Sequence, residues 1–236
     1  MRINNTREIA QASPTILIYG PSKAGKTYIL NTVPEPERSL VISAEAGLLT
    51  IAGEKGPGLD YIEISSIDEL RKIVVWLQSS EEAQKYSFLA LDSISEIAEI
   101  CLAEEKENER DPRKAYGNMA NTVMGIVRGF KHMPKTVYLS CRQDMIVDAG
   151  SNMYYQIGMP GKAVIGLLPY VLDEVYAMVV SQDENGELRR WVQTQNDGVH
   201  ISCGTRGNAL ERFEKPCFTH ILNKMNTEIT TAAKAA

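Results

Sequence analysis

The chain has 236 residues, of which 44% are hydrophobic and 23% charged, and its formal net charge is −5 at pH 7. This length and composition fit one globular domain with a substantial core, and they exclude a low-complexity chain. The acidic balance excludes a protein that holds nucleic acid through its overall field, because such proteins are strongly basic. If this protein binds DNA, it must use local loops.

The ends of the chain and the cysteines limit where the protein works. The start, MRINNTREIAQAS, lacks the apolar centre of a signal peptide, and no run reaches the ~18 apolar residues of a membrane span. The cysteines are scattered without a C-x-x-C pair, at Cys101, Cys141, Cys203 and Cys217. We therefore expect reduced core cysteines in a cytoplasmic protein, with neither a disulfide frame nor a metal site built from them.

Apolar runs predict a series of strands in chain order, at 15–19, 39–43, 61–65, 88–91, 136–141 and 174–180. Helical patterns lie between them: one directly after residue 27, one opened by the capping box Ser66-x-x-Glu69, one after Asp92, and one through Met119 and Phe130. Alternating strands and helices with continuous apolar strands predict an α/β fold. Its sheet is mostly parallel and covered by helices on both faces.

The last predicted strands have a different character. Segments 174–182 and 187–195 flank a turn that contains Asn185-Gly186, a dipeptide typical of tight hairpins. We therefore expect the sheet to end in antiparallel strands. Domain boundaries follow: an N-terminal segment at 1–13 that contacts another subunit, a core at 14–225, and a flexible Ala/Thr-rich tail at 226–236.

The stretch GPSKAGKT at 20–27 matches the pattern G-x-x-x-x-G-K-T at every required position, after a strand and before a helical pattern. Glycines let successive backbone N–H groups point at phosphate oxygens, and a following helix would add its positive dipole end. The Lys26 side chain would reach the β- and γ-phosphates, and the Thr27 hydroxyl would bind Mg²⁺. The predicted nucleotide-binding residues are Gly20, Pro21, Ser22, Lys23, Ala24, Gly25, Lys26, Thr27 and Tyr28.

Three polar residues at predicted strand ends could complete a hydrolytic site. Asp92 follows the apolar run Phe88–Leu91, and we expect it to hold Mg²⁺ from the strand beside the P-loop strand, although it could also simply cap a helix. Glu45 follows the strand at 39–43 and could orient and deprotonate water, or be a surface loop residue. Gln143 follows the strand at 136–141 and could sense the γ-phosphate, or begin a solvated loop.

In this order, the motifs resemble those of the RecA-like recombinase ATPases. The P-loop comes first, then a strand ending in Ala44-Glu45, a hydrophobic strand ending in Asp92-Ser93, and a strand ending at Gln143 before a DNA-binding loop. More narrowly, the chain is similar to compact phage-encoded members that are described as nucleotide-binding proteins or as single-strand annealing recombinases. The segments AYGNMANTVMGIVRGFKHMPKTVYLSCRQD, MPGKAV and SCGTRG carry this similarity, which covers residues 14 to about 215.

The resemblance implies ATP and Mg²⁺ as cofactors, a DNA-stimulated ATPase activity and a homo-oligomer, either a filament or a ring. It also implies single-stranded DNA and a single-stranded DNA-binding protein as partners, with no membrane, in the bacterial host of a phage. The chain departs from the family in three places. It lacks room for the extra C-terminal domain of bacterial recombinases, and only about a dozen residues precede the core, so we expect a separate N-terminal oligomerisation element to be missing or minimal. The trans-acting lysine pair of the bacterial recombinases is also not matched. Arg206 is the nearest candidate for a catalytic cation, in its own subunit or a neighbour's.

The family's two DNA-facing loops would fall at 105–116 and 144–162. The resemblance implies that aromatic and apolar side chains there stack on bases while basic ones contact phosphates. A solvated helix end and a mobile loop packed on the domain remain the alternatives. The candidate DNA-binding residues are Arg113, Lys114, Arg142, Met153, Tyr154, Tyr155 and Lys162.

Two functions from different classes remain open at this point. One is an ATP-dependent recombinase or annealing protein that binds single-stranded DNA. The other is a nucleotide-gated protein-interaction switch, or an accessory motor in phage replication or packaging, without direct DNA contact. The net charge of −5 favours the switch, whereas the long segment after Gln143 favours the recombinase.

Overall fold

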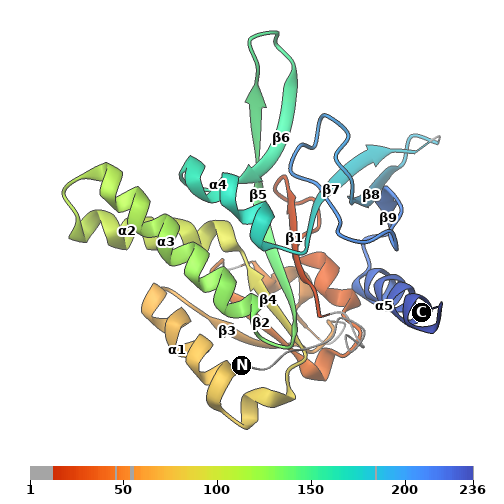
Figure 1. Cartoon of the computed structure of the whole chain (residues 1–236), viewed down its shortest axis with the longest axis horizontal. Helices are drawn as coiled ribbons and strands as arrows, with labels where there is room; N and C mark the ends of the chain where they lie inside the picture. The colour runs from red at the N-terminus through yellow and green to blue at the C-terminus, as the bar shows by residue number, and fades with distance from the viewer. Residues whose placement is uncertain (1–12, 46, 54–55, 184, 236) are drawn as a thin grey trace.

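The computed structural model describes residues 13–45, 47–53, 56–183 and 185–235. The predicted subunit-contact segment at 1–13 lies outside these residues except for its last one. Figure 1 shows one twisted sheet at the centre of the molecule with helices against it. The strands are β1 (Thr15–Gly20), β2 (Ser39–Ser43), β3 (Asp60–Glu63), β4 (Phe88–Asp92), β5 (Thr136–Val147), β6 (Met153–Gly158), β7 (Glu174–Gln182), β8 (Leu188–Gln193) and β9 (Phe213–Glu214).

The sheet order is β3-β2-β4-β5-β1-β7-β8-β9, with β6 paired to the far part of β5. The strands from β3 to β7 run parallel in this order, and β8 and β9 are antiparallel additions at one edge. The predicted mostly parallel α/β sheet with a terminal antiparallel hairpin is therefore confirmed. One detail of the prediction is wrong: β4, which ends in Asp92, does not neighbour β1, because β5 lies between them.

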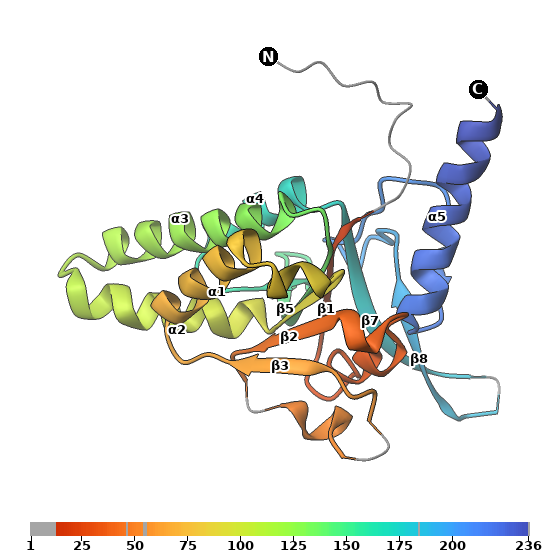
Figure 2. The same ribbon diagram turned by 90° about the horizontal axis from the view of Figure 1, so that it is seen from below.

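Helices cover both faces of the sheet (Figure 2). The buried apolar residues form two separate clusters, one on each face. One face packs against α1 (Ile67–Ser79), α2 (Ile94–Asn108), α3 (Pro112–Lys131) and α4 (Lys162–Val171). The other face packs against α5 (Phe218–Ala235) and the short 3-10 helix η2 (Tyr28–Thr32). The apolar positions predicted for the helices, such as Ile94, Met119 and Phe130, are fully buried, which confirms the two-faced packing.

The helix expected directly after the P-loop is reduced to η2, which has only five residues. Its end is set by Pro34, because the residue before a proline is pushed out of the helical region, and Val33 is extended with φ −63° and ψ 143°. The dipole of a long helix is therefore not part of this phosphate site, and the prediction of such a helix is wrong.

The predicted flexible tail at 226–236 is helical over the described residues, since α5 continues to Ala235, and its flexibility stays a prediction. Alanine-rich sequence has high helix propensity, and the start of α5 is held by the core. The ring of Phe218 packs edge-to-face on Phe88 at 5.2 Å and on Tyr138 at 4.9 Å between ring centroids.

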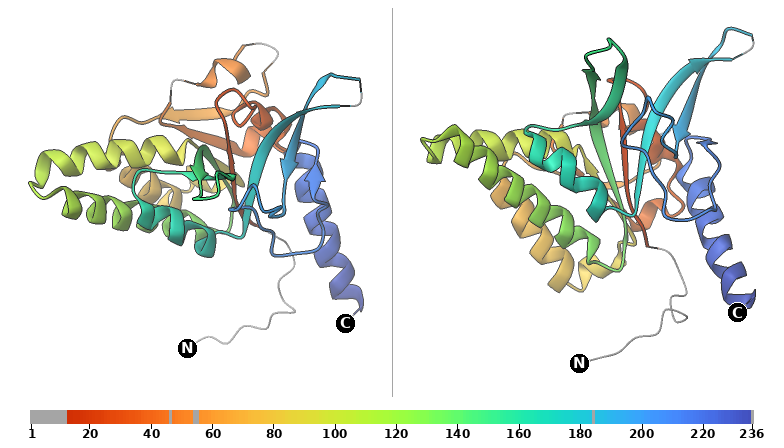
Figure 3. Two further views of the ribbon diagram at one scale, coloured as in Figure 1. Left: turned by 90° about the horizontal axis from the view of Figure 1, so that it is seen from above. Right: turned by 45° about the horizontal axis from the view of Figure 1, so that its top comes forward.

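The segments expected to be DNA-binding loops have regular structure. Most of 105–116 forms the end of α2, the start of α3 and the tight turn between them. Most of 144–162 forms an antiparallel hairpin of β5 and β6, with Asp144 opposite Gln156 and Val147 opposite Met153. We call residues 143–158 the arm. It projects beyond the carboxyl edge of the sheet beside the β7–β8 hairpin (Figure 3, right).

A side-chain turn closes the arm. The Asp148 carboxylate accepts hydrogen bonds from the backbone N–H groups of Gly150 at 2.8 Å and Asn152 at 3.0 Å. The same carboxylate accepts one from the Tyr154 hydroxyl at 2.9 Å. These bonds hold the pKa of Asp148 at about 2, led by those from Asn152. The sequence prediction missed this turn because residues 148–152 contain neither an Asn-Gly nor an Asp-Gly pair.

Candidate nucleotide site

The P-loop is formed where β1 ends at Gly20, between β5 and β7. Gly25 has φ +110°, a left-handed conformation that favours glycine. The loop also lies tightly on β7, because a Cβ on Gly20 would be only 3.0 Å from Met178 Cβ. The Lys26 ammonium donates to the carbonyls of Gly20 and Pro21 at 2.8 Å each, so it lies inside the curve of the loop. Burial lowers its pKa.

Thr27 in the loop after β1 contacts Asp92 at the end of β4, although β1 and β4 are not neighbouring strands. The Thr27 hydroxyl donates to Asp92 Oδ2 at 2.8 Å, and the hydroxyl of Ser140, on the intervening strand β5, donates to Asp92 Oδ1. Burial raises the pKa of the Asp92 carboxyl, while the bonds from Ser140 and Thr27 oppose that rise. A hydroxyl and a carboxylate at hydrogen-bond distance are hard oxygen donors. They fit Mg²⁺, which takes one or two protein oxygens and completes its shell with water and phosphate.

Glu45 is fixed next to this pair by β2 and β4. The backbone N–H of Ala44 donates to the carbonyl of Asp92 at 2.9 Å, which joins the ends of the two strands. The hydroxyl of Ser93 donates to Glu45 Oε1. Glu45 is exposed, so its carboxylate lies where water reaches it. A carboxylate that lines this cavity and is open to water can act as a general base.

Lys26, Thr27, Glu45, Asp92 and Gln143 all line one cavity of about 1010 Å³. All of the predicted P-loop residues line it as well except Ala24, which is buried in the core beneath the loop. The structure thus brings together the residues predicted from separate strand ends, and their catalytic and binding roles remain predictions. A cavity of this size is ample for a nucleotide, since ligand pockets of ≈ 300–1,000 Å³ are usual.

Several further residues of the cavity wall were not anticipated from the sequence, among them Glu96, Ser140 and Arg190. Glu96 lies in the first turn of α2, where its backbone N–H donates to the Ser93 hydroxyl at 3.2 Å. Ser140 lies on the predicted strand that ends near Gln143, and this shared strand end is the one signal that could have indicated it. Arg190 comes from β8, which no nucleotide motif marks.

Arg206 does not reach this cavity in its own chain. Its guanidinium bonds Asp173 at 3.0 Å and the Leu172 carbonyl at 3.0 Å. Asp173 in turn accepts from the backbone N–H of Thr15, at the start of β1, whereas the P-loop follows its end. Five residue steps of ~3.3 Å put roughly 17 Å between these ends. A catalytic role for Arg206 within its own subunit is therefore wrong, and a role across a subunit interface stays a prediction.

The arm residues differ in how far they are available to a ligand. Met153 is 55% exposed near the tip. Tyr155 is partly buried and stacks on His200, with ring centroids 5.3 Å apart. Its backbone also pairs with Val199 and Ile201. The Tyr155 ring therefore fastens the arm to the 196–203 segment, and its contact with a base stays a prediction.

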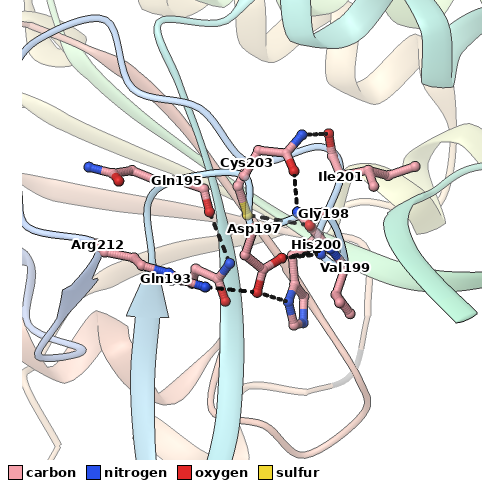
Figure 4. Close-up of polar contacts among 11 residues, drawn as sticks. Gln193, Gln195, Asp197, Gly198, Val199, His200, Ile201, Cys203 and Arg212 are labelled. Atoms are coloured by element: carbon pink, nitrogen blue, oxygen red, sulfur yellow. Dashed lines mark hydrogen bonds and ion pairs between the residues drawn. The ribbon is translucent and has the colours of Figure 1, made fainter.

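The 196–203 segment is itself ordered by one carboxylate. Asp197 accepts hydrogen bonds from the backbone N–H groups of Val199 at 2.9 Å and His200 at 2.6 Å, and pairs with Arg212 at 3.4 Å (Figure 4). These contacts lower the pKa of Asp197 against the opposing effect of its burial. The segment is thus a built support for the base of the arm.

The predicted basic contacts lie on two surfaces. Arg142 lines the nucleotide cavity and pairs with Glu99 at 2.7 Å. Arg113, Lys114 and Lys162 are exposed at the starts of α3 and α4. These helix starts are close together, because a Cβ on Gly161 would be 3.1 Å from the Tyr116 ring. The structure therefore brings the basic residues of the two predicted DNA segments to one side of the molecule.

The strand order, the P-loop and the carboxylates around it define a P-loop ATPase with a RecA-like fold. The chain belongs to the AAA domain family, whose model matches residues 12–202. Among solved structures, it is similar to a KaiC-like protein from the hyperthermophilic archaeon Pyrococcus horikoshii, at 17% identity, with 77% of each chain covered and a TM-score of 0.43. No curated protein matches. Within the described residues, no helix has the length and apolar character needed to cross a membrane.

Proposed function

We propose that this protein couples ATP binding and hydrolysis to the holding and pairing of single-stranded DNA, as an ATP-dependent annealing protein or recombinase. The observation that carries the proposal is the course of β5. This strand places Ser140, Arg142 and Gln143 at the nucleotide cavity and runs on without a break into the arm. A change at the terminal phosphate can therefore be transmitted to the arm through a single rigid strand.

Each residue at the cavity has a chemical task in this proposal. Backbone N–H groups of the P-loop and the Lys26 ammonium hold the triphosphate. Mg²⁺, held by Thr27 and Asp92, would neutralise charge on the phosphates during transfer. Glu45 orients a water molecule for in-line attack and takes its proton, and Ser93 fixes the Glu45 carboxylate. The Gln143 amide bonds the γ-phosphate or this water, so its position depends on which nucleotide is bound.

The surface proposed for DNA combines the arm with the basic residues beside it. Met145, Val147 and Met153 are 56%, 57% and 55% exposed on the arm and offer apolar surface for bases. Arg113, Lys114 and Lys162 lie near each other, and Lys106 is 5.5 Å above the Tyr116 ring in the same region. Bases would stack on the arm while these cations contact phosphates. We further propose that copies of this chain line up along the strand, with a single-stranded DNA-binding protein as a partner.

The test is the affinity for a fluorescent single-stranded oligonucleotide, measured by anisotropy with ATP analogue, with ADP and with neither. We expect tight binding only with the analogue, and faster ATP hydrolysis when DNA is added. Replacing Met145 and Met153 by Ser should weaken DNA binding and leave basal hydrolysis unchanged. Equal DNA affinity in all nucleotide states, or none at low salt, contradicts the proposal.

A nucleotide-gated protein-interaction switch is the second candidate, and one observation favours it. Between Gln143 and Lys162 the only charged residues are Asp144 and Asp148, both acidic. An arm with exposed apolar residues and acidic charge suits a protein partner in phage replication or packaging better than a polynucleotide. The same Met145 and Met153 variants decide between the two functions: loss of a protein partner with no change in DNA affinity would favour the switch.

A further inference from the structure

We infer that Arg190 is the cation that contacts the phosphates of a nucleoside triphosphate bound in the same chain. This inference rests on the proposed nucleotide binding and adds a residue that neither the P-loop motif nor the predicted Arg206 finger supplies. Arg190 lies on β8, far from the P-loop in sequence, yet it lines the same cavity as the loop.

The register of β8 explains why this side chain faces the P-loop. Val192 is opposite Met178 on β7, and both are buried in the cluster that contains Ala24 of the P-loop. Alternate residues of a strand share a face, so Arg190 lies on the same face as Val192. The two residues are about 6.7 Å apart along the strand. At that point the apolar cluster ends and the cavity begins. The strand therefore presents a cation where its buried face reaches the phosphate loop.

The contact with the loop is close. A Cβ built on Gly25 would be 3.2 Å from Arg190 Cδ and 3.5 Å from its Nε. The aliphatic stem thus covers the glycine that precedes Lys26, and the guanidinium continues from it. Any side chain at position 25 would meet both the left-handed φ and this stem. Arginine suits the position because its fork of N–H donors matches phosphate oxygens.

The guanidinium charge of Arg190 is not neutralised by an ion pair in the part of the chain that the structure describes, whereas the charges of Arg189 and Arg142 are. Among the described residues, no carboxylate forms an ion pair with it, although the adjacent Arg189 pairs with Asp183 at 2.9 Å and Glu187 at 2.8 Å. Arg142, the other arginine at the cavity, is paired with Glu99. An unpaired arginine on the wall of an anion site has its binding capacity available for the ligand.

Position and charge together assign the β7–β8 hairpin a role as one wall of the nucleotide site. The P-loop surrounds the phosphates from below, and Arg190 approaches them from the adjacent hairpin. A triphosphate with bound Mg²⁺ still carries net negative charge after Lys26 is counted, so a further cation at this wall strengthens binding. Adenosine has no phosphate and gains nothing from the contact.

The experiment compares Arg190→Ala, Arg190→Lys and the matched control Arg189→Ala. The affinity of each for a fluorescent, non-hydrolysable ATP analogue is measured with Mg²⁺ at low and moderate salt. Because a charge-assisted hydrogen bond contributes more than a neutral one, we expect Arg190→Ala to weaken binding by about tenfold or more, with a smaller salt dependence. Arg190→Lys should recover most of the affinity, and Arg189→Ala should match the wild type.

Thermal unfolding of each variant separates a lost contact from a damaged fold, and competition by adenosine should be equal in all four proteins. Wild-type affinity in Arg190→Ala, or equal losses in Arg190→Ala and Arg189→Ala, would overturn the assignment of Arg190 alone. If Arg190→Lys binds as weakly as Arg190→Ala while thermal stability is unchanged, a simple phosphate contact is also overturned. A wild-type protein that binds no triphosphate would instead remove the proposed function itself.

Discussion

The Lys26 side chain is the residue whose loss should matter most for binding. It already lies within the loop, on the carbonyls of Gly20 and Pro21 at 2.8 Å. Lys26→Ala removes the charge that we propose bonds the β- and γ-phosphates, and at ~1.5–3 kcal/mol for each charged hydrogen bond we expect about 100-fold weaker ATP binding. Calorimetric titration measures it. An affinity within threefold of the wild type would show that the phosphates lie elsewhere.

Glu45 should matter for turnover and not for binding. A positioned general base contributes ~10²–10⁴-fold, so Glu45→Gln should slow hydrolysis by at least about 100-fold while nucleotide affinity is retained. Glu96 lines the same cavity and supplies the matched control, Glu96→Gln, which we expect to hydrolyse ATP normally. Single-turnover assays with both variants measure the chemical step. Slow hydrolysis by Glu96→Gln together with normal hydrolysis by Glu45→Gln would assign the general base to Glu96.

The Asp92 carboxyl predicts a pH dependence of metal binding. Burial raises its pKa above that of an exposed aspartate, and only the ionised form binds Mg²⁺ well. As the pH falls through this raised pKa, the proton competes with the metal. Mg²⁺-dependent nucleotide affinity should therefore begin to decline at a higher pH than an exposed aspartate would give. Titrations from neutral pH downward, with Asp92→Asn as the pH-insensitive control, measure this and correct for protonation of the nucleotide.

At the level of single residues, the sequence predicted the parts of the site that lie at strand ends. Glu45, Asp92 and Gln143 each follow an apolar run, and the carboxyl ends of parallel strands converge at one edge. Arg190 escaped prediction because it lies within an antiparallel strand, where its position depends on the β7–β8 register. Arg206 was misplaced because a Gly-rich motif does not indicate which edge of the sheet its loop faces.

At the level of elements, local patterns predicted the strands and the amphipathic helices, and failed where tertiary contacts decide. The predicted loop at 144–162 is a hairpin because Asp148 closes a turn and Tyr155 packs on His200. The Tyr155–His200 contact has no short-range signature, and the Asp148 turn lacks the Asn-Gly or Asp-Gly pair that is typical of tight hairpins. The helix predicted after the P-loop is longer than the observed one. The apolar Tyr28–Leu30 run favours a helix, but Pro34 keeps the preceding residue out of the helical region.

The helix α5 begins beyond the part of the chain that the family model matches, yet the structure makes it part of the core. Phe218 is fully buried between Phe88 and Tyr138. Phe218→Ala should reduce the free energy of unfolding by about 3–5 kcal/mol, because the large side chain leaves a cavity. Urea unfolding measures the change. Phe213→Ala, at a position that is 42% exposed, is the control and should cost far less.

For the whole molecule, the distribution of charge matters more than its sum. The net charge of −5 opposes DNA binding at long range, so any binding depends on the basic residues at the starts of α3 and α4. If the arm moves with the bound nucleotide, as we propose, these basic residues would provide a DNA contact that does not depend on the nucleotide.

The proposed contact between the basic residues and DNA phosphates predicts that the DNA affinity depends measurably on salt concentration. If Lys106, Arg113, Lys114 and Lys162 each neutralise one phosphate, the logarithm of the DNA affinity should fall against the logarithm of salt concentration with a slope of about −2.8, at ~0.7 for each contact with a single strand. Changing all four to Gln should bring the slope close to zero. Lys72→Gln is the control, because Lys72 is exposed on α1 and pairs with Asp68 at 2.7 Å. A slope that the fourfold change leaves intact would place the DNA on another surface.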